Sequence, residues 1–292
     1  MNQNDCLAQF LHFDSVVPPG LYNASAIHCL ICSFDLEEVF NVLQTRRWGP
    51  GQIRLMYQGT DRSSELGRPS GRREAGVITL DFIRSCLSEG MTFVIPALHI
   101  HQLCVRKACL RLGRELHCAV QANAYLSPPG GIGFPPHWDD HDVFAIQMAG
   151  RKLWKVDEHI AVGDTLSADT VFCSGAAEID ANAPSYMLTP GDGLFVPRGH
   201  NHCARSLDEI SLHVTMAIKR WTWSDLIEAA LKSALRRDTR AAQAIGLPTL
   251  LRSQLDEHDI KWVIDVLAVT IEPARLAEIM STLGAVPEPQ KG

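Results

Sequence analysis

Two stretches of sequence decide the fold: NAYLSPPGGIGFPPHWDDHDVFAIQMAGRKLWKV at Asn123 to Val156 and LFVPRGHNHCARS at Leu194 to Ser206. In both, short apolar runs rich in β-branched and aromatic residues alternate with turns made of Gly, Pro, Asn and Asp. The same alternation extends over residues 117–218. It predicts many short antiparallel strands, which is the pattern of a double-sheet jelly roll.

The first stretch also carries a candidate metal site. Successive side chains of a β-strand point to opposite faces, so His137 and Asp139 are expected on the same face of one strand. A third ligand must come from elsewhere, and His202 follows a turn-strand-turn segment in the second stretch. Two histidines and one carboxylate leave open positions on an octahedral Fe(II). A His-x-Asp triplet alone is a weak motif, and His141 and His200 are competing ligands.

With these motifs, HWDDHDVFAIQMAGRKLW followed by GDGLFVPRGHNH, the chain resembles the cupin-type JmjC oxygenases. The resemblance is to the ribosomal-oxygenase branch, which hydroxylates protein side chains. It implies a mainly β fold with some α, a double-stranded β-helix (jelly roll, cupin/JmjC) flanked by helices. It also implies Fe(II) as cofactor, 2-oxoglutarate as co-substrate and O2, with His137, Asp139 and His202 as the iron ligands.

The resemblance further implies a 2-oxoglutarate pocket. Lys152 falls on the basic residue that binds the distal carboxylate, and Asn123, Tyr125 and Thr215 fall on residues that line the pocket. A hydroxyl residue often found in the family is replaced here by Ala217. The chemistry agrees, because the far carboxylate of a dianion needs one cation in an otherwise apolar barrel, and lysine supplies a compact point charge.

Each of these pocket residues also has a purely structural interpretation. Lys152 could be a solvated lysine at a strand end. Asn123 could be a buried amide that satisfies backbone groups, and Tyr125 a packed aromatic ring with its hydroxyl hydrogen bonded.

Composition limits the function classes. The 292 residues are 46% hydrophobic and 21% charged with a net charge of −6, and no basic run suggests nucleic-acid binding. No apolar run approaches the roughly 20 residues of a membrane span, and the amino terminus has no secretion-signal pattern. Nine scattered cysteines indicate reduced thiols and a cytoplasmic protein, with Cys29 and Cys32 interpreted as small buried hydrophobes.

Local signals predict three helices and a loop. Helices are expected at Phe34–Leu43, capped by Ser33, and at Ile78–Leu87 and Leu103–Leu116. The loop at Gly59–Gly76, rich in Gly, Ser and Arg, is expected to be mobile.

The sequence after Arg220 changes character. WTWSDLIEAALKSALRR has helical apolar spacing with Ser224 as the expected N-cap, and residues 260–267 and 274–283 repeat the helical pattern. We therefore expect an oxygenase domain over residues 1–220 and a helical segment over 221–292 that forms a homodimer. The alternative is that these helices fold back on the barrel and cover its outer sheet in a monomer. In the resembling family a winged-helix domain follows such helices, and here it is expected to be reduced or absent.

The predicted function is an Fe(II)- and 2-oxoglutarate-dependent hydroxylase acting on a side chain of a protein or peptide. Two alternatives stay open at this point. The enzyme could modify a small biosynthetic peptide or a free amino acid, or the chain could be a non-catalytic cupin that senses metal. Retention of Lys152 favours an enzyme, because a sensor does not need the co-substrate cation.

Overall fold

The computed structural model divides into two units, residues 1–219 and residues 220–292. The structure describes residues 19–48, 51–67, 73–74, 77–160, 179–236, 257–270 and 277–279.

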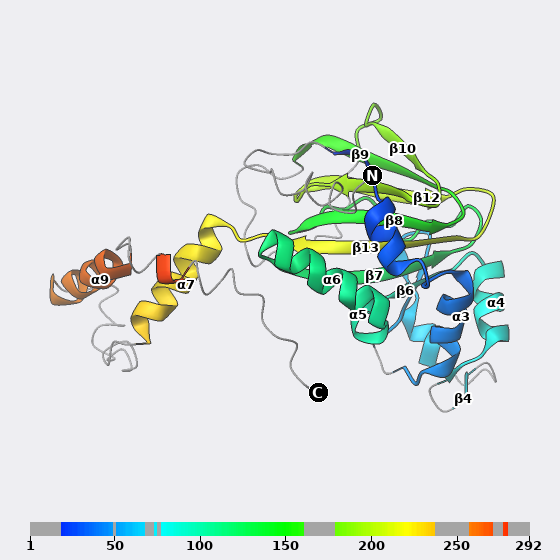
Figure 1. Cartoon of the computed structure of the whole chain (residues 1–292), viewed down its shortest axis with the longest axis horizontal. Coiled ribbons are helices and arrows are strands. Elements are labelled where there is room, and N and C mark those ends of the chain that lie inside the picture. The colour runs from blue at the N-terminus through cyan, green and yellow to red at the C-terminus, as the bar shows by residue number, and fades with distance from the viewer. Residues whose placement is uncertain are drawn as a thin grey trace. The chain divides into compact units, whose positions relative to one another are not determined.

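Two antiparallel sheets form the barrel of the first unit, and a separate two-stranded sheet lies outside their strand order (Figure 1). The larger sheet has the order β1 (Gly20–Asn23), β11 (Asp192–Val196), β8 (Asp142–Ala149), β13 (Ser211–Lys219), β7 (Ala119–Ser127), β6 (Thr92–Ile95), β2 (Arg54–Tyr57) and β3 (Thr60–Asp61). The smaller sheet has the order β10 (Ser185–Leu188), β9 (Lys152–Ile160) and β12 (His200–Ser206). Chain neighbours β8 and β9 lie in different sheets, which is how a double-stranded β-helix is wound. The predicted fold class is confirmed.

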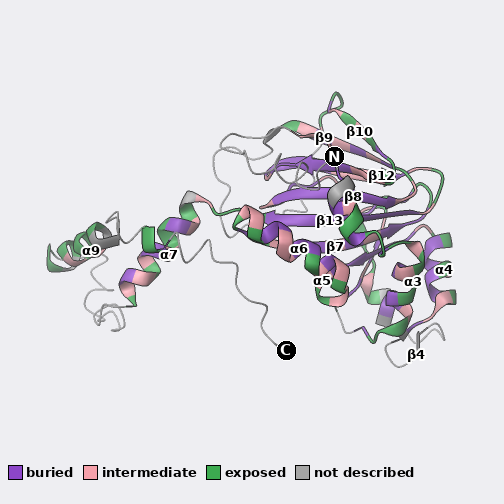
Figure 2. Ribbon diagram, viewed as in Figure 1, coloured by how far each residue is buried: buried purple, intermediate pink, exposed green. Residues whose placement is uncertain are grey.

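Helices cover the outer face of the larger sheet. They are α2 (Ser25–Ile31), α3 (Leu36–Thr45), α4 (Leu80–Ser88), α5 (Leu98–His101) and α6 (Leu103–Leu116). Helix α6 has the predicted bounds and contacts β7 and α2. Its buried side chains are Val105, Ala108, Cys109 and Leu112, which recur at helical spacing and join the main core. The central strands are buried (Figure 2), so the sheets are well packed on either side of the space between them.

Two local expectations were wrong. Helix α3 is capped by Asp35, not Ser33, because the Asp35 carboxylate accepts the Glu38 N–H at 2.9 Å. Cys29 and Cys32, expected to be buried, are exposed. In its described part, the segment Gly59–Gly76 contains β3, a 3-10 helix at Ser63–Gly67 and β4 (Arg73–Glu74), which pairs with β5 (Val77–Ile78), and its mobility stays a prediction.

The second unit is helical in its described parts. Helix α7 (Trp223–Leu235) begins with a capping box in which Thr222, not the expected Ser224, is the N-cap. A second helix, α9, spans Glu257–Thr270, and most of the helix expected at 274–283 lies outside the described residues. Leu226, Ala230 and Ile279 form a small buried cluster. None of the described helices is long and apolar enough to cross a membrane.

Candidate metal centre and co-substrate pocket

The three predicted metal ligands come together. His137 and Asp139 lie on the segment before β8 and His202 lies on β12, and one ligand atom from each lies within 4.8 Å of the other two. Both histidines are buried. Among the residues that the structure describes, this is the one group of three or more His, Cys, Asp or Glu side chains with such spacing.

The local backbone differs from the predicted strand. His137 forms an isolated bridge with His202, in which the two residues exchange N–H···O hydrogen bonds of 3.1 and 2.8 Å. Pro135 and Pro136 precede it, and because proline has no N–H to donate, the pairing does not extend into a ladder. One bridge is nevertheless enough to bring the two imidazoles together, with ring centroids 4.3 Å apart.

The imidazoles are prepared for a metal. The Nδ1 atom of His137 lies 2.8 Å from the Pro135 carbonyl oxygen, and that of His202 lies 3.0 Å from the His200 carbonyl oxygen. A proton on each Nδ1 leaves the Nε2 lone pair of each ring to act as the metal donor. The Nε2 atom of His202 is 3.6 Å from Asp139 Oδ2. Burial lowers the pKa of both histidines to about 4, so both are neutral near pH 7, as a metal ligand must be.

The competing histidines are placed differently. His200 is buried, but it does not line the cavity described below, and its Nδ1 lies 3.3 Å from the Arg198 carbonyl oxygen. His141 lines the cavity, with its Nδ1 2.8 Å from the Asp140 carboxylate. Neither belongs to the three-residue cluster.

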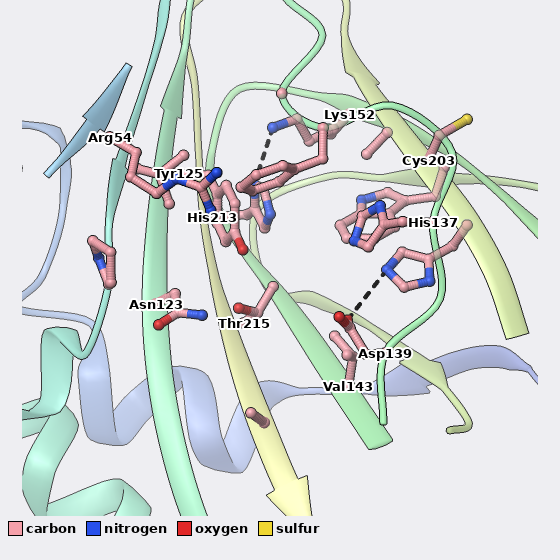
Figure 3. A pocket seen from close by; sticks show the side chains of 18 of the residues that line it. Arg54, Asn123, Tyr125, His137, Asp139, Val143, Lys152, Cys203, His213 and Thr215 are labelled. Carbon is pink, nitrogen blue, oxygen red and sulfur yellow. Dashed lines mark hydrogen bonds and ion pairs between the residues drawn. The ribbon is translucent and has the colours of Figure 1, made fainter. Parts of the chain in front are cut away.

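A cavity of about 200 Å³ lies between the two sheets, next to the three-residue cluster (Figure 3). Residues of both sheets and of the segment between β7 and β8 line it: Arg54, Val94, Pro96, Asn123, Tyr125, Gly133, Phe134, His137, Asp139, His141, Val143, Lys152, Trp154, His202, Cys203, Ala204, His213, Thr215 and Ala217. All seven residues that the sequence analysis proposed for metal or 2-oxoglutarate are among them.

Lys152 is the most deeply buried charged group of the cavity. It lies on β9, is 1% exposed, and its Nζ donates to Ser127 Oγ at 2.9 Å and approaches His213 Nδ1 at 3.1 Å. Burial lowers the pKa of Lys152 to about 7. The interpretation as a solvated strand-end lysine is therefore wrong. Burial, and next the charge of Lys152, lower the pKa of His213 well below its usual value, so His213 is a neutral acceptor for the ammonium.

The other predicted pocket residues lie on neighbouring strands, Asn123 and Tyr125 on β7 and Thr215 on β13. Asn123 accepts the Ala97 N–H at 3.0 Å, so its amide has a structural role as well as a place in the cavity. Burial raises the pKa of the Tyr125 phenol to about 12, and Thr215 and Asn123 hydrogen bond to it. Its ring stacks on His213 at 4.5 Å. The phenol is thus neutral and held by these neighbours.

Sequence reasoning missed four of the residues that surround the pocket: Arg54, Ser127, Phe134 and His213. His213 had a usable signal, since it is two residues before Thr215 on the same strand and hence on the same face. Arg54 had none. It reaches the cavity only through the pairing of β2 with β6 and of β6 with β7.

Comparisons with known proteins agree with this fold. The family model of the JmjC domain matches residues 97–226. The Caenorhabditis elegans protein named bifunctional lysine-specific demethylase and histidyl-hydroxylase NO66 is 31% identical over 288 residues, covering 88% of this chain and 37% of the relative. The Drosophila erecta protein of that name is 32% identical, covering 63% of this chain and 28% of the relative. The chain thus spans well under half the length of these relatives.

Two solved structures show the same fold. The X-ray structure of ycfD from E. coli superposes with a TM-score of 0.59 at 18% identity, covering 97% of this chain and 74% of that one. The structure of YcfD, a ribosomal oxygenase from Escherichia coli, in complex with cobalt and 2-oxoglutarate gives a TM-score of 0.52 at 17% identity, covering 86% and 63%. Residues 97–226 are therefore a JmjC domain. Within that family, the chain resembles the ribosomal oxygenases and the NO66 proteins.

Proposed function

We propose that this protein is an Fe(II)- and 2-oxoglutarate-dependent oxygenase that hydroxylates a side chain within a protein or peptide. One observation carries the proposal: a two-His-one-carboxylate cluster and a buried lysine line the same cavity between the two sheets. The YcfD complex with cobalt and 2-oxoglutarate and the histidyl-hydroxylase name of the NO66 relatives support it.

His137, Asp139 and His202 are the proposed iron ligands. Two imidazole nitrogens and one carboxylate oxygen are the donor set that would hold an octahedral Fe(II) and leave coordination positions for the co-substrate and oxygen. When bound there, the iron supplies the activation of O2 together with 2-oxoglutarate. Each imidazole is oriented by a backbone carbonyl, that of Pro135 for His137 and that of His200 for His202.

Lys152 is the proposed anchor of the co-substrate. Its ammonium would meet the distal carboxylate in a buried site, where a charge-assisted hydrogen bond is strong. Ser127 and His213 orient Nζ before the co-substrate arrives. Asn123, Tyr125 and Thr215 form the adjoining polar wall. Holding both ends of 2-oxoglutarate in this way positions it against the metal and limits the access of water.

Succinate release tests the proposal. The purified chain with Fe(II) and 2-oxoglutarate is expected to form succinate, and more of it when a substrate peptide is present. A mass search for a +16 shift in peptides from cells with and without the gene would identify the substrate. Absence of any 2-oxoglutarate-dependent succinate from iron-loaded protein would refute the proposed chemistry.

The affinity for 2-oxoglutarate is expected to fall as pH rises above about 7. The pKa of Lys152 is lowered to about 7 in the free protein, and a bound dianion raises it again, so above this pH binding must take up a proton. Kd should be nearly constant below about pH 6, roughly double by pH 7 and rise on the order of thirtyfold by about pH 8.5. Calorimetry on metal-loaded protein measures this. Lys152→Arg is the control, since a guanidinium stays charged and should remove the dependence.

We also propose that the second unit forms a homodimer. Ile227 of α7 and Ile260 and Ile264 of α9 are 59%, 46% and 57% exposed, and exposed apolar side chains on helices favour an interface. Light scattering is expected to give twice the 32.2 kDa of one chain, and truncation after Arg220 to halve the assembly. A mass near that of one chain at micromolar concentration would contradict the dimer.

A cytoplasmic location of the protein likewise stays a prediction.

A further inference from the structure

A row of four side chains crosses the larger sheet on its cavity face. Arg54 of β2 is paired with Val94 of β6, Val94 with Tyr125 of β7, and Tyr125 with His213 of β13. Residues directly opposite in antiparallel pairs share a face, and all four line the cavity. The row therefore starts at Arg54 and ends at the histidine that holds Lys152.

The guanidinium of Arg54 is fixed in place. Its Nε and Nη2 donate to Asp61 Oδ2 at 3.0 and 2.8 Å, and its Cζ lies 4.9 Å from the centre of the Phe134 ring. Figure 3 shows Arg54 next to Tyr125, across the cavity from His137 and Asp139. No hydrogen bond of Nη1 is found within the described part of the chain. A guanidinium that is held by an ion pair and keeps further N–H donors is suited to bind a hydrogen-bond acceptor of a substrate.

The charges of the cavity are unequal. Two cationic side chains, Arg54 and Lys152, line the cavity. Asp139 is the one carboxylate among the lining residues. Under the proposed function Asp139 is taken by the metal, which adds two positive charges. The neighbouring carboxylates are also engaged, Asp61 by Arg54 and Asp140 by His141. A cationic side chain entering this cavity would find no free carboxylate among these groups.

We propose that Arg54 selects the substrate: it donates hydrogen bonds to an uncharged acceptor on the target, such as an amide or imidazole, and repels lysine and arginine side chains. The inference rests on the proposed function. It bears on the two activities named for the NO66 relatives, since histidyl hydroxylation presents a neutral ring and lysine demethylation a cation. The contacts of Arg54 favour the first, because the Phe134 face that could bind a methylammonium already carries the guanidinium.

Pooled synthetic peptides with degenerate flanks and a fixed central residue, either His, Asn, Lys or Arg, test the assignment. The iron- and 2-oxoglutarate-loaded full chain is incubated with each pool, and the +16 shift on the central residue and total succinate are measured. Wild type is expected to modify the His or Asn pools about tenfold or more over the Lys and Arg pools, because one like charge in the site is worth at least that much.

Variants at Arg54 separate charge from shape. Arg54→Gln should reduce the preference to near parity, and Arg54→Glu should reverse it, whereas Arg54→Lys should still exclude cations and lose the paired hydrogen bonds to Asp61 Oδ2. Arg111→Gln is the matched control. Arg111 is 35% exposed, against 34% for Arg54, and forms a comparable ion pair with Glu115 on α6, outside the cavity. Its substitution should leave the preference unchanged.

Two results would overturn the assignment while leaving the chemistry intact. One is equal modification of the Lys and His pools by wild type. The other is an unchanged preference in an Arg54→Glu variant that still releases succinate without peptide. Loss of succinate from the wild-type chain would instead reject the proposed function itself.

Discussion

Replacing any one of His137, Asp139 or His202 by Ala is expected to abolish succinate formation and to remove the bound iron. Each supplies one of three ligand atoms that lie within 4.8 Å of one another, so a single loss leaves an incomplete face of the ion. Changes to groups that merely support a ligand already cost about 10–100-fold in metal affinity or activity. A direct ligand should cost at least about 100-fold. Metal content by elemental analysis and succinate by mass spectrometry measure the two effects separately.

The neighbouring histidines provide the controls. The His200→Ala and His141→Ala variants should retain iron, since His200 lies outside the cavity lining and His141 is hydrogen bonded to Asp140. A metal-bound structure with His200 in the coordination sphere and His202 turned away would contradict the assignment. So would tetrahedral zinc closed by a cysteine, for which Cys203 in the cavity wall is the available thiol.

The grouping of His137, Asp139 and His202 could be predicted from sequence because two of the three lie close together in the chain and the third follows a recognisable turn. A two-residue spacing puts His137 and Asp139 on one side of an extended segment, and a turn signal precedes His202. Helix α6 was predictable for a similar reason, since its apolar residues recur at helical spacing over its whole length. The residues at which the helices begin were less predictable. Asp35 and Thr222 are the N-caps instead of the nearby Ser33 and Ser224, because Asp, Thr and Ser have similar preferences for the N-cap position.

What the sequence could not supply is the register between distant strands. Arg54 enters the cavity because β2 pairs with β6 and β6 with β7, and nothing near Arg54 in the chain encodes those pairings. The same holds for the partners of Lys152, since Ser127 is 25 residues away and His213 is 61. Site residues that depend on such long-range pairing are visible only once the sheet is assembled.

Lys152→Ala is expected to weaken 2-oxoglutarate binding strongly while leaving iron binding nearly unchanged. Lys152 is 1% exposed and its hydrogen-bonding neighbours, Ser127 and His213, carry no negative charge, so the co-substrate carboxylate would be its first anionic partner. Losing one charge-assisted hydrogen bond costs on the order of 1.5–3 kcal/mol. This corresponds to roughly a tenfold or greater increase in Kd.

Two further variants define the origin of that loss. Lys152→Arg should recover part of the affinity, because the charge remains while the shape differs. Lys155→Ala, on the same strand but outside the cavity lining, should change nothing. Titration of 2-oxoglutarate into metal-loaded protein, followed by calorimetry, compares all three with wild type. If the Lys152→Ala chain bound 2-oxoglutarate as tightly as wild type, the anchor would have to be the other cation of the cavity, Arg54, and the co-substrate would lie across the site in the opposite direction.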